Sequence, residues 1–383
     1  MTGIALAALV FCAFATLVHL ITAGLAFWRI RAADRRERRP SSGSVTVIRP
    51  VCGLDYFDEL TLRSTFGIDH PDVEIIFCCA REQDPAVPVI RALISAYPAV
   101  SARLLIGDDK PTANPKLNTL AKGWRSARGD WVVLADSNVL MPPGYVSELF
   151  ASFLPGTGLV CSPPVGSLPK GFWAELECAF LNTYQARWQY AADTIGFGFA
   201  QGKSMLWRRA DLNAVGGIAA LGIEIAEDAA ATKVVRDRGL RVRLVDRPFE
   251  QPLGPRRAQQ VWDRQVRWAR LRRSTFPIFY MPEIFTGSFL PLLVGTYAAA
   301  TLSYDPVVAA ALLAIVWFGT EGLLAWVAGW HLSVWSPAAW LLRDLLLPIL
   351  WIKGLAGSSF TWRGNEMSVA EQAAPPEPRE AQA

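Results

Sequence analysis

Long apolar runs stand at both ends of this chain, and a stretch of alternating apolar and polar residues lies between them. The first run, Ile4 to Phe27, would reach roughly 36 Å as a helix, which is enough to span a bilayer. Basic residues follow this run instead of preceding it: Arg29, Arg31, Arg35, Arg36, Arg38 and Arg39. That order favours an uncleaved anchor over a signal peptide and predicts that the following segment faces the cytoplasm. The same arginines would also suit contact with anionic lipid headgroups.

The segment from Ser44 to Pro282 reads as one α/β domain, because short β-branched runs alternate with amphipathic stretches. The expected strands are Val45–Ile48, Val73–Cys79, Arg103–Ile106 and Trp131–Ala135. The expected helices between them are Pro85–Tyr97 and Leu117–Ser126. Such alternation predicts a parallel sheet with ligand sites at the carboxyl ends of its strands.

The pattern changes again after Pro282. Two runs, 284–302 and 307–330, are apolar enough to span a membrane. The last run, 338–357, contains Arg343, Asp344 and Lys353, which are costly in lipid. It fits a third span, a re-entrant segment or an interfacial helix.

The predicted organisation therefore has five parts. They are an N-terminal membrane anchor (1–28), a basic cytoplasmic linker (29–43), a globular α/β domain (44–282), a membrane region of two or three helices (283–357) and a polar tail (358–383), disordered from about residue 370.

The composition supports a chain with both membrane and globular parts, and it argues against a nucleic-acid partner. The 383 residues are 52% hydrophobic and 19% charged, with a mean hydropathy of +0.23, too apolar for an ordinary soluble protein. The net charge of +4 is scattered along the chain, so no nucleic-acid partner is expected. The six cysteines show no CxxC spacing and are expected to be reduced core residues, and the three histidines have no metal-ligand spacing.

Carboxylates follow two of the predicted strands. Asp136 comes directly after the strand ending at Ala135, where it could hold a divalent cation beside a nucleotide diphosphate or simply cap a turn. Asp84 lies shortly after Cys79 and could bind a nucleoside or cap the helix that Pro85 opens.

Three further segments carry polar side chains of the right kind. Lys116 and Asn118, in the segment 114–118, could meet a phosphate or belong to a plain helix start. Either Glu227 or Asp228 could act as a base, although anions are also favoured at the start of any helix. The segment Arg264–Trp268 clusters cations with an indole, which fits either diphosphate binding or ordinary juxtamembrane basicity.

The set and its order resemble a known family. The chain is similar to the family-2-like GT-A glycosyltransferases, and within them to the ceramide glucosyltransferases, from the N-terminal anchor through nearly its whole length. The segments that carry the resemblance are Arg49–Asp55, Asp84–Ala86, Asn114–Asn118, Asp136–Ser137, Gly202–Met205, Ala226–Asp228, Arg264–Trp268 and Thr361–Arg363.

The resemblance implies an α/β fold of the GT-A (Rossmann-like) type with transmembrane helices at both ends, and roles for single residues. Asp84 and Asp136 match aspartates that serve the nucleotide-sugar and its Mg²⁺ or Mn²⁺, with Asp136 as the metal ligand, and Asp228 matches the catalytic base. The (Q/R)xxRW motif matches Arg264, Arg267 and Trp268, which hold diphosphate and acceptor. Asn138 departs from the DxD pattern of the GT-A group and leaves the expected metal site with less charge.

The expected activity is an inverting transfer of glucose from UDP-glucose to the primary hydroxyl of ceramide. Asp228 would take the proton of the lipid hydroxyl, while the cation at Asp136 and the guanidinium of Arg267 would stabilise the departing UDP. The same chemistry on a hopanoid or another lipid alcohol, with UDP-glucose or UDP-N-acetylglucosamine, is the alternative, and a non-catalytic membrane scaffold is a weaker one. The protein is expected to be a multi-pass membrane protein, in a bacterial inner membrane, with a cytoplasmic catalytic domain.

Overall fold

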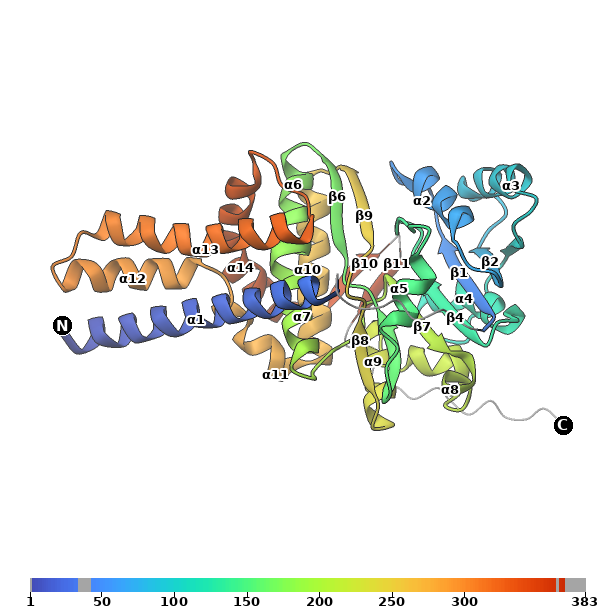
Figure 1. Cartoon of the computed structure of the whole chain (residues 1–383), viewed down its shortest axis with the longest axis horizontal. Coiled ribbons are helices and arrows are strands. Elements are labelled where there is room, and N and C mark those ends of the chain that lie inside the picture. The colour runs from blue at the N-terminus through green and yellow to red at the C-terminus, as the bar shows by residue number, and fades with distance from the viewer. Residues whose placement is uncertain (1, 34–42, 363–364, 369–383) are drawn as a thin grey trace.

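The structure is a computed structural model of the chain that describes residues 2–33, 43–362 and 365–368. A globular part holds the strands, and three helices, α1, α12 and α13, project from one of its ends (Figure 1). The predicted disorder from about residue 370 lies outside the described residues.

The globular part is built on a seven-stranded sheet with the order β3-β2-β1-β4-β7-β5-β8. Its strands are β1 (Val45–Val51), β2 (Val73–Cys79), β3 (Ala102–Ile106), β4 (Trp131–Ala135), β5 (Thr157–Cys161), β7 (Ser204–Arg208) and β8 (Arg241–Leu244). The α/β class predicted from the sequence is confirmed. The four expected strands pair in parallel as predicted, in the order β3-β2-β1-β4. The sheet as a whole is mixed, because β7 runs antiparallel to both β4 and β5.

Helices cover this sheet and fix the loops at its edge. They are α2 (Asp58–Ser64), η1 (Thr65–Gly67), α3 (Ala86–Ala96), α4 (Pro115–Ser126), α5 (Tyr145–Ala151), α8 (Arg209–Asn213), η3 (Gly217–Gly222) and α9 (Glu227–Asp237). The start of α4 is set locally: Asn114 caps it by accepting hydrogen bonds from the backbone N–H groups of Lys116 and Leu117, and Pro115 occupies its first turn.

A second layer joins the sheet to the projecting helices. It contains the parallel strands β6 (Val165–Lys170) and β9 (Glu250–Pro255). Beside them run α6 (Phe172–Ala179), the π-helical turn η2 (Phe180–Ala186), α7 (Arg187–Thr194) and α10 (Ala258–Thr275). Because α6, η2 and α7 follow one another without a break, they form one long support between the sheet and the apolar helices.

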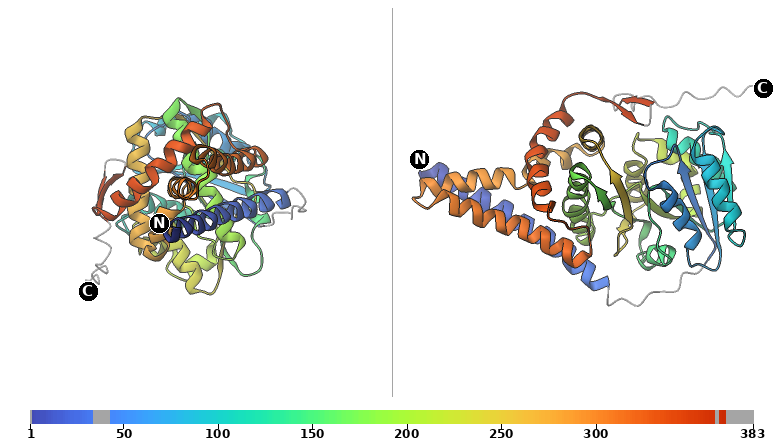
Figure 2. Two further views of the ribbon diagram at one scale, coloured as in Figure 1. Left: turned by 90° about the vertical axis from the view of Figure 1, so that its left-hand side faces the viewer. Right: turned by 90° about the horizontal axis from the view of Figure 1, so that it is seen from above.

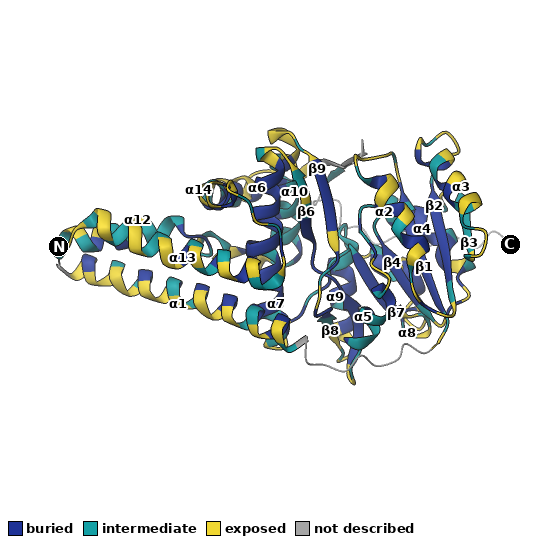
Figure 3. Ribbon diagram, turned by 45° about the horizontal axis from the view of Figure 1, so that its top comes forward, coloured by how far each residue is buried: buried dark blue, intermediate teal, exposed yellow. Residues whose placement is uncertain are grey.

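The apolar helices are α1 (Thr2–Ala33), α12 (Phe289–Thr301), α13 (Pro306–Ala328) and α14 (Ser336–Leu355), with α11 (Pro277–Tyr280) and η4 (Met281–Phe285) before α12. In the described part of the chain, Gly3–Ala32 and Pro306–Ala328 are long and apolar enough to cross a membrane. The predicted span 284–302 is divided: the pair Pro277–Phe285 and Phe289–Thr301 is bent by 41° and counts as a third crossing only if it is one broken span. Large apolar residues of α1, α12 and α13 are exposed, and exposed residues recur along these helices in Figure 3, as expected of helices that contact lipid.

The last apolar run forms α14, which lies crosswise to α1, α12 and α13 (Figure 2) and packs against α6 and α10. Its charged pair Arg343 and Asp344 is buried against the protein instead of facing lipid. Arg343 pairs with both Asp344 and Glu321 of α13. The third span, the re-entrant segment and the interfacial helix stay predictions for this run.

Two predicted boundaries differ from the structure. The first helix continues to Ala33, and Arg29, expected in a linker, is buried within it and pairs with Asp193 and Asp246. The predicted polar tail begins with a hairpin of β10 (Ser359–Trp362) and β11 (Asn365–Ser368). Among the cysteines, Cys52 is exposed, whereas the other five are buried as predicted.

Candidate active site

The carboxyl end of β4 meets the start of β7 at the edge of the sheet. Ala135 pairs with Ser204 across these antiparallel strands, and the backbone N–H of Asp136 donates to the carbonyl of Lys203. The side chains meet as well: Lys203 Nζ lies 2.9 Å from Asp136 Oδ2 and 3.2 Å from Asn138 Oδ1. The antiparallel pairing therefore brings a lysine onto the predicted metal ligand.

A second lysine reaches the same carboxylate from α4. Lys116 Nζ lies 2.6 Å from Asp136 Oδ1 and 2.9 Å from the carbonyl oxygen of Gly202, and it also binds Glu227. The side chain of Lys116 is only 8% exposed. Lys116 thus joins the end of β4, the loop before β7 and the start of α9 in one ion cluster.

The two carboxylates at the start of α9 have different surroundings. Glu227 binds Lys116, and its other oxygen accepts a hydrogen bond from Asn114 Nδ2. Asp228 accepts only backbone N–H groups in the described contacts, from Ala229 at 2.8 Å and Gly202 at 3.3 Å. Of the pair that the sequence left open, Glu227 is committed to an ion pair, and Asp228 is the one that no cation binds directly.

The proton affinities follow from these contacts. Burial and the neighbouring charge of Glu227 raise the pKa of Asp228 to about 6. Burial acts in the same direction on Asp136, but the ammonium groups of Lys116 and Lys203 outweigh it and hold the pKa of Asp136 well below its usual value. Asp136 is therefore a permanent anion near neutral pH, while Asp228 is poised to exchange a proton.

Gly202 lets these groups approach one another. A Cβ on Gly202 would lie 2.7 Å from Glu227 Oε1, closer than real side chains come. A side chain at this position would therefore have to displace the Glu227 carboxylate from its place beside Lys116.

Arg49 of β1 is a residue of this site that the sequence did not mark as functional. It is fully buried, and its Nη2 donates to the carbonyl oxygens of Asp136, Ser137 and Val139 at 2.7–2.9 Å. Arg49 fixes the turn that presents Asp136. Its signals in the sequence are a charged residue at the end of an apolar run and its place at the start of the segment Arg49–Asp55, which carries part of the family resemblance.

Asp84 lies in the loop between β2 and α3, Asn118 lies in the first turn of α4, and both make local contacts. Asp84 accepts hydrogen bonds from the backbone N–H groups of Gly53, at 2.9 Å, and of Ala86, so it joins the ends of β1 and β2 and caps α3. Asn118 accepts from the backbone N–H of Thr112 at 3.0 Å and orders the loop before α4. Both shape the edge of the sheet on which a nucleotide would lie.

The segment Arg264–Trp268 lies on α10 and divides between two faces of that helix. Arg264 binds the buried carboxylate of Glu177, stacks over the Trp268 ring at 5.8 Å and acts electrostatically on Lys203. Trp268 packs against the apolar cluster of Ala174, Cys178, Leu181 and Leu253. Gln265 points the other way, towards Gln185.

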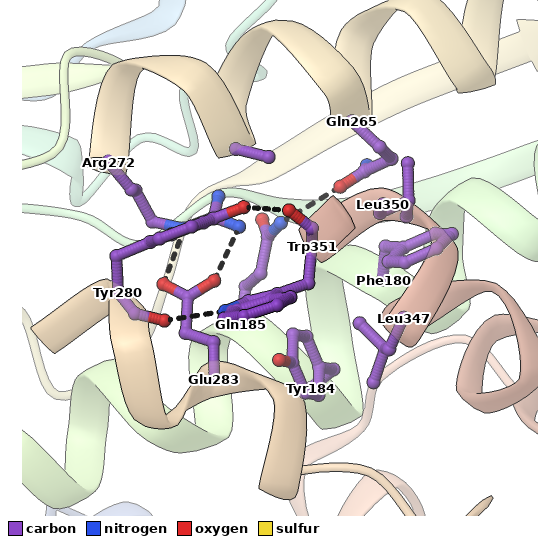
Figure 4. Close-up of a pocket in the computed structure, with 11 residues that line it drawn as sticks. Phe180, Tyr184, Gln185, Gln265, Arg272, Tyr280, Glu283, Leu347, Leu350 and Trp351 are labelled. Carbon is purple, nitrogen blue, oxygen red and sulfur yellow. Dashed lines mark hydrogen bonds and ion pairs between the residues drawn. The ribbon is translucent and has the colours of Figure 1, made fainter. Parts of the chain in front are cut away.

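Gln265 and Gln185 belong to a separate pocket (Figure 4). Most of its walls are apolar or aromatic, and the Arg272–Glu283 ion pair closes its polar side. Its lining residues are Phe180, Tyr184, Gln185, Gln265, Ala269, Arg272, Tyr280, Glu283, Leu347, Leu350 and Trp351. None of the described residues of the ion cluster lines this pocket, so it is distinct from the site around Asp136.

The residues around Asp136 fit a divalent cation only in part. Carboxylate and amide oxygens, such as those of Asp136 and Asn138, suit Mg²⁺ or Mn²⁺. In the described part of the chain, however, no group of three His, Cys, Asp or Glu side chains could hold a metal. Lys203 already binds oxygens of both Asp136 and Asn138, so a metal would have to displace its ammonium group.

Comparisons with known proteins point to one family. The sequence profile of glycosyl transferase family 21 matches residues 11–374. Ceramide glucosyltransferase 3 of Caenorhabditis elegans is 27% identical over 371 residues, which cover 94% of this chain and 79% of that protein. The ceramide glucosyltransferase of Komagataella phaffii is 30% identical over 321 residues, covering 69% of this chain and 63% of the relative.

Among solved structures, a mannosyltransferase from Pyrobaculum calidifontis in complex with GDP-Man and Mn²⁺ is similar to this chain at 17% identity. The match covers 91% of this chain and 99% of that one, with a TM-score of 0.49.

Proposed function

The chain belongs to glycosyl transferase family 21, and from this premise we propose that it transfers glucose from UDP-glucose to the primary hydroxyl of ceramide with inversion at the anomeric carbon. The relatives named ceramide glucosyltransferase support the donor sugar and the acceptor. The single observation that carries the chemistry is Asp228, a carboxylate with a pKa of about 6 beside the ion cluster of Asp136. A base of that pKa is largely ionised near neutral pH and still accepts a proton.

The nucleotide-sugar would lie along the edge of the sheet. The loops that would hold the nucleoside are shaped by Asp84 and Asn118. The diphosphate would lie beside the ion pair of Lys116 and Asp136. Arg264 and Arg267 of α10 would face the diphosphate, and Trp268 would support them and border the acceptor. A divalent cation, when bound, would be held by Asp136 and Asn138 and would add positive charge beside the diphosphate.

The reaction itself moves one proton and one glycosidic bond. The acceptor oxygen attacks the anomeric carbon from the face opposite UDP, the bond between that carbon and the diphosphate oxygen breaks, and Asp228 takes the hydroxyl proton. Positive charge around the diphosphate stabilises the negative charge that develops on UDP. A positioned base contributes about 10²- to 10⁴-fold to the rate of such a step.

The apolar helices explain how a lipid would reach this site. Arginines follow α1 in the sequence, so the positive-inside rule puts the globular part on the cytoplasmic side, of a bacterial inner membrane as we propose. The crosswise α14 would then lie at the membrane surface. The headgroup hydroxyl of a lipid would meet the site there while its chains stay in the bilayer.

The test is transfer by the purified protein in detergent. UDP-glucose and UDP-N-acetylglucosamine are supplied with ceramide or a hopanoid alcohol, in Mg²⁺ or Mn²⁺, and lipid products are read by mass spectrometry. We expect hexosyl-ceramide from the wild type and at least about 10²-fold less from Asp228→Ala. Asp237→Ala, which removes an exposed carboxylate from the same helix, is the matched control and should keep full activity.

Two other outcomes have clear meanings. Product on the hopanoid alone would keep Asp228 as the base and replace ceramide as the acceptor. Absence of both lipid product and UDP release would overturn the proposed transfer and favour a scaffold.

A further inference from the structure

Lys203 has no role in the proposed reaction, although its ammonium group binds Asp136 and Asn138 in the ion cluster. Lys203 directly precedes β7, and β7 pairs with β4, the strand that ends just before Asp136. Its side chain is 18% exposed, against 8% for Lys116, so Lys203 is the more open of the two lysines.

The two lysines differ in how many acceptors they have. Lys116 Nζ has three, in Asp136, Glu227 and Gly202, which matches the three N–H bonds of an ammonium group. Among residues 2–33, 43–362 and 365–368, Lys203 Nζ has two, Asp136 Oδ2 and Asn138 Oδ1. One of its donors is therefore left for a further acceptor on the open side of the cluster.

We propose that Lys203 is a donor-binding residue: held between Asp136 and Asn138, its ammonium group binds the diphosphate of the nucleotide-sugar. The inference rests on the proposed nucleotide-sugar donor and adds a residue to its site. The acceptor is identified by its chemistry, since a diphosphate offers charged oxygens that a lysine binds as a point charge.

The neighbours of Lys203 support an anionic ligand at this place. Asp136 and Glu227 are matched by Lys116 and Lys203 through direct ion pairs. Arg264 is committed to Glu177 but still acts electrostatically on Lys203 from α10. The positive field at Lys203 thus has a contribution from Arg264 of α10 as well as from Lys116.

The same geometry makes Lys203 and a divalent cation alternatives at one position. Both would use oxygens of Asp136 and Asn138, and these already bind the ammonium group. Asn138 is neutral, so the pair of residues carries one negative charge, which one ammonium group balances. Removing Lys203 should therefore weaken nucleotide binding and at the same time open the position to a metal.

The experiment measures UDP binding by calorimetry on the detergent-purified full chain in EDTA. Lys203→Met should raise the Kd for UDP roughly tenfold or more, because one charge-assisted hydrogen bond is lost. Lys203→Arg, which keeps the charge, should stay within about threefold of the wild type. Lys122→Met is the matched control: Lys122 donates to the Ile106 carbonyl, outside the ion cluster, and its loss should leave the Kd unchanged.

Binding of Mn²⁺ alone, followed by electron paramagnetic resonance, provides a second readout. Lys203→Met should bind Mn²⁺ several-fold more tightly than the wild type, because Asp136 and Asn138 lose their ammonium partner. Thermal unfolding of each variant checks that it is folded.

Three results would overturn the inference. They are a Lys203→Met protein that binds UDP in EDTA as tightly as the wild type, a wild type that binds no UDP in EDTA, and equal Mn²⁺ affinity in the two proteins. The proposed function fails separately: if UDP binds as predicted but no glucose reaches any lipid, the role of Lys203 stands and the transfer does not.

Discussion

Asp228 and Glu227 are adjacent in the sequence, but their contacts give them different chemistry. Glu227 forms an ion pair with Lys116. Asp228 is partly buried beside the negative charge of Glu227. The pKa of about 6 that results makes Asp228 the titrating group of the proposed reaction.

The pH dependence of transfer follows from that value. Because the base must be ionised, kcat/KM should fall about tenfold per pH unit below about pH 6 and level off above it. A pH–rate profile at limiting UDP-glucose measures this. An activity that stays constant down to about pH 5 would contradict a base with a pKa of about 6.

The ionised form of Asp228 should also lower the free energy of unfolding of the protein. Its pKa is raised on folding from 3.8 to about 6, so the folded state is disfavoured when Asp228 is ionised, and this penalty is relieved as pH falls from about 6 towards 4. Asp228→Asn should therefore be more stable than the wild type at pH 7.5, by on the order of 1 kcal/mol, and lose this advantage near pH 4. Chemical unfolding at the two pH values tests it, and a less stable variant at pH 7.5 would contradict it.

At the scale of elements, α14 has two different faces. One face binds the rest of the protein through the charged residue Arg343, and the opposite face exposes apolar side chains. Arg343 Nη2 lies 2.8 Å from Glu321 Oε1 of α13, and Arg343 Nη1 also donates to the carbonyl of Ala179 at the end of α6. The opposite face carries exposed apolar side chains one or two turns apart: Leu341, Leu345, Ile349 and Ile352. A helix of this kind is suited to lie in the membrane interface.

Breaking the pair between α13 and α14 should be costly. Arg343→Met leaves Glu321 buried without its cation and should destabilise the protein by roughly 3–5 kcal/mol. The double variant Arg343→Met/Glu321→Gln leaves only Asp344 buried without its cation and should recover part of the loss. Thermal unfolding in one detergent compares the three proteins, and a double variant as unstable as the single one would show that the charge pair is not the cause.

At the scale of the whole molecule, one exposed cysteine reports the orientation in the membrane. Cys52 follows β1 at the edge of the sheet, and the other five cysteines are buried. If the globular part is cytoplasmic, a membrane-impermeant maleimide should label inside-out vesicles and leave intact spheroplasts unlabelled. Cys52→Ser should abolish the labelling, and a wild type labelled in spheroplasts would reverse the proposed topology.

Local sequence pattern determined much of this architecture. The strands 73–79 and 131–135 have the predicted bounds, because a β-branched apolar run between turn residues specifies a buried strand by itself. The long apolar runs likewise specify α1 and α13 as helices long enough to cross a membrane. The family resemblance marked Asp136 and Asp228 for the same reason, since each lies at a fixed place beside a strand or helix end.

Only the tertiary structure decided which side chains meet. The antiparallel direction of β7 puts Lys203 opposite Asp136, 67 residues away in sequence, and a local pattern does not encode which strands pair or in which direction. The tertiary structure also decided that Arg29 and Arg343 are buried and paired with carboxylates. In the sequence they are only charged residues near or within apolar runs. The sequence determines what each segment can form, but the partners of a charge depend on contacts between distant segments, and these partners decide its pKa and its role.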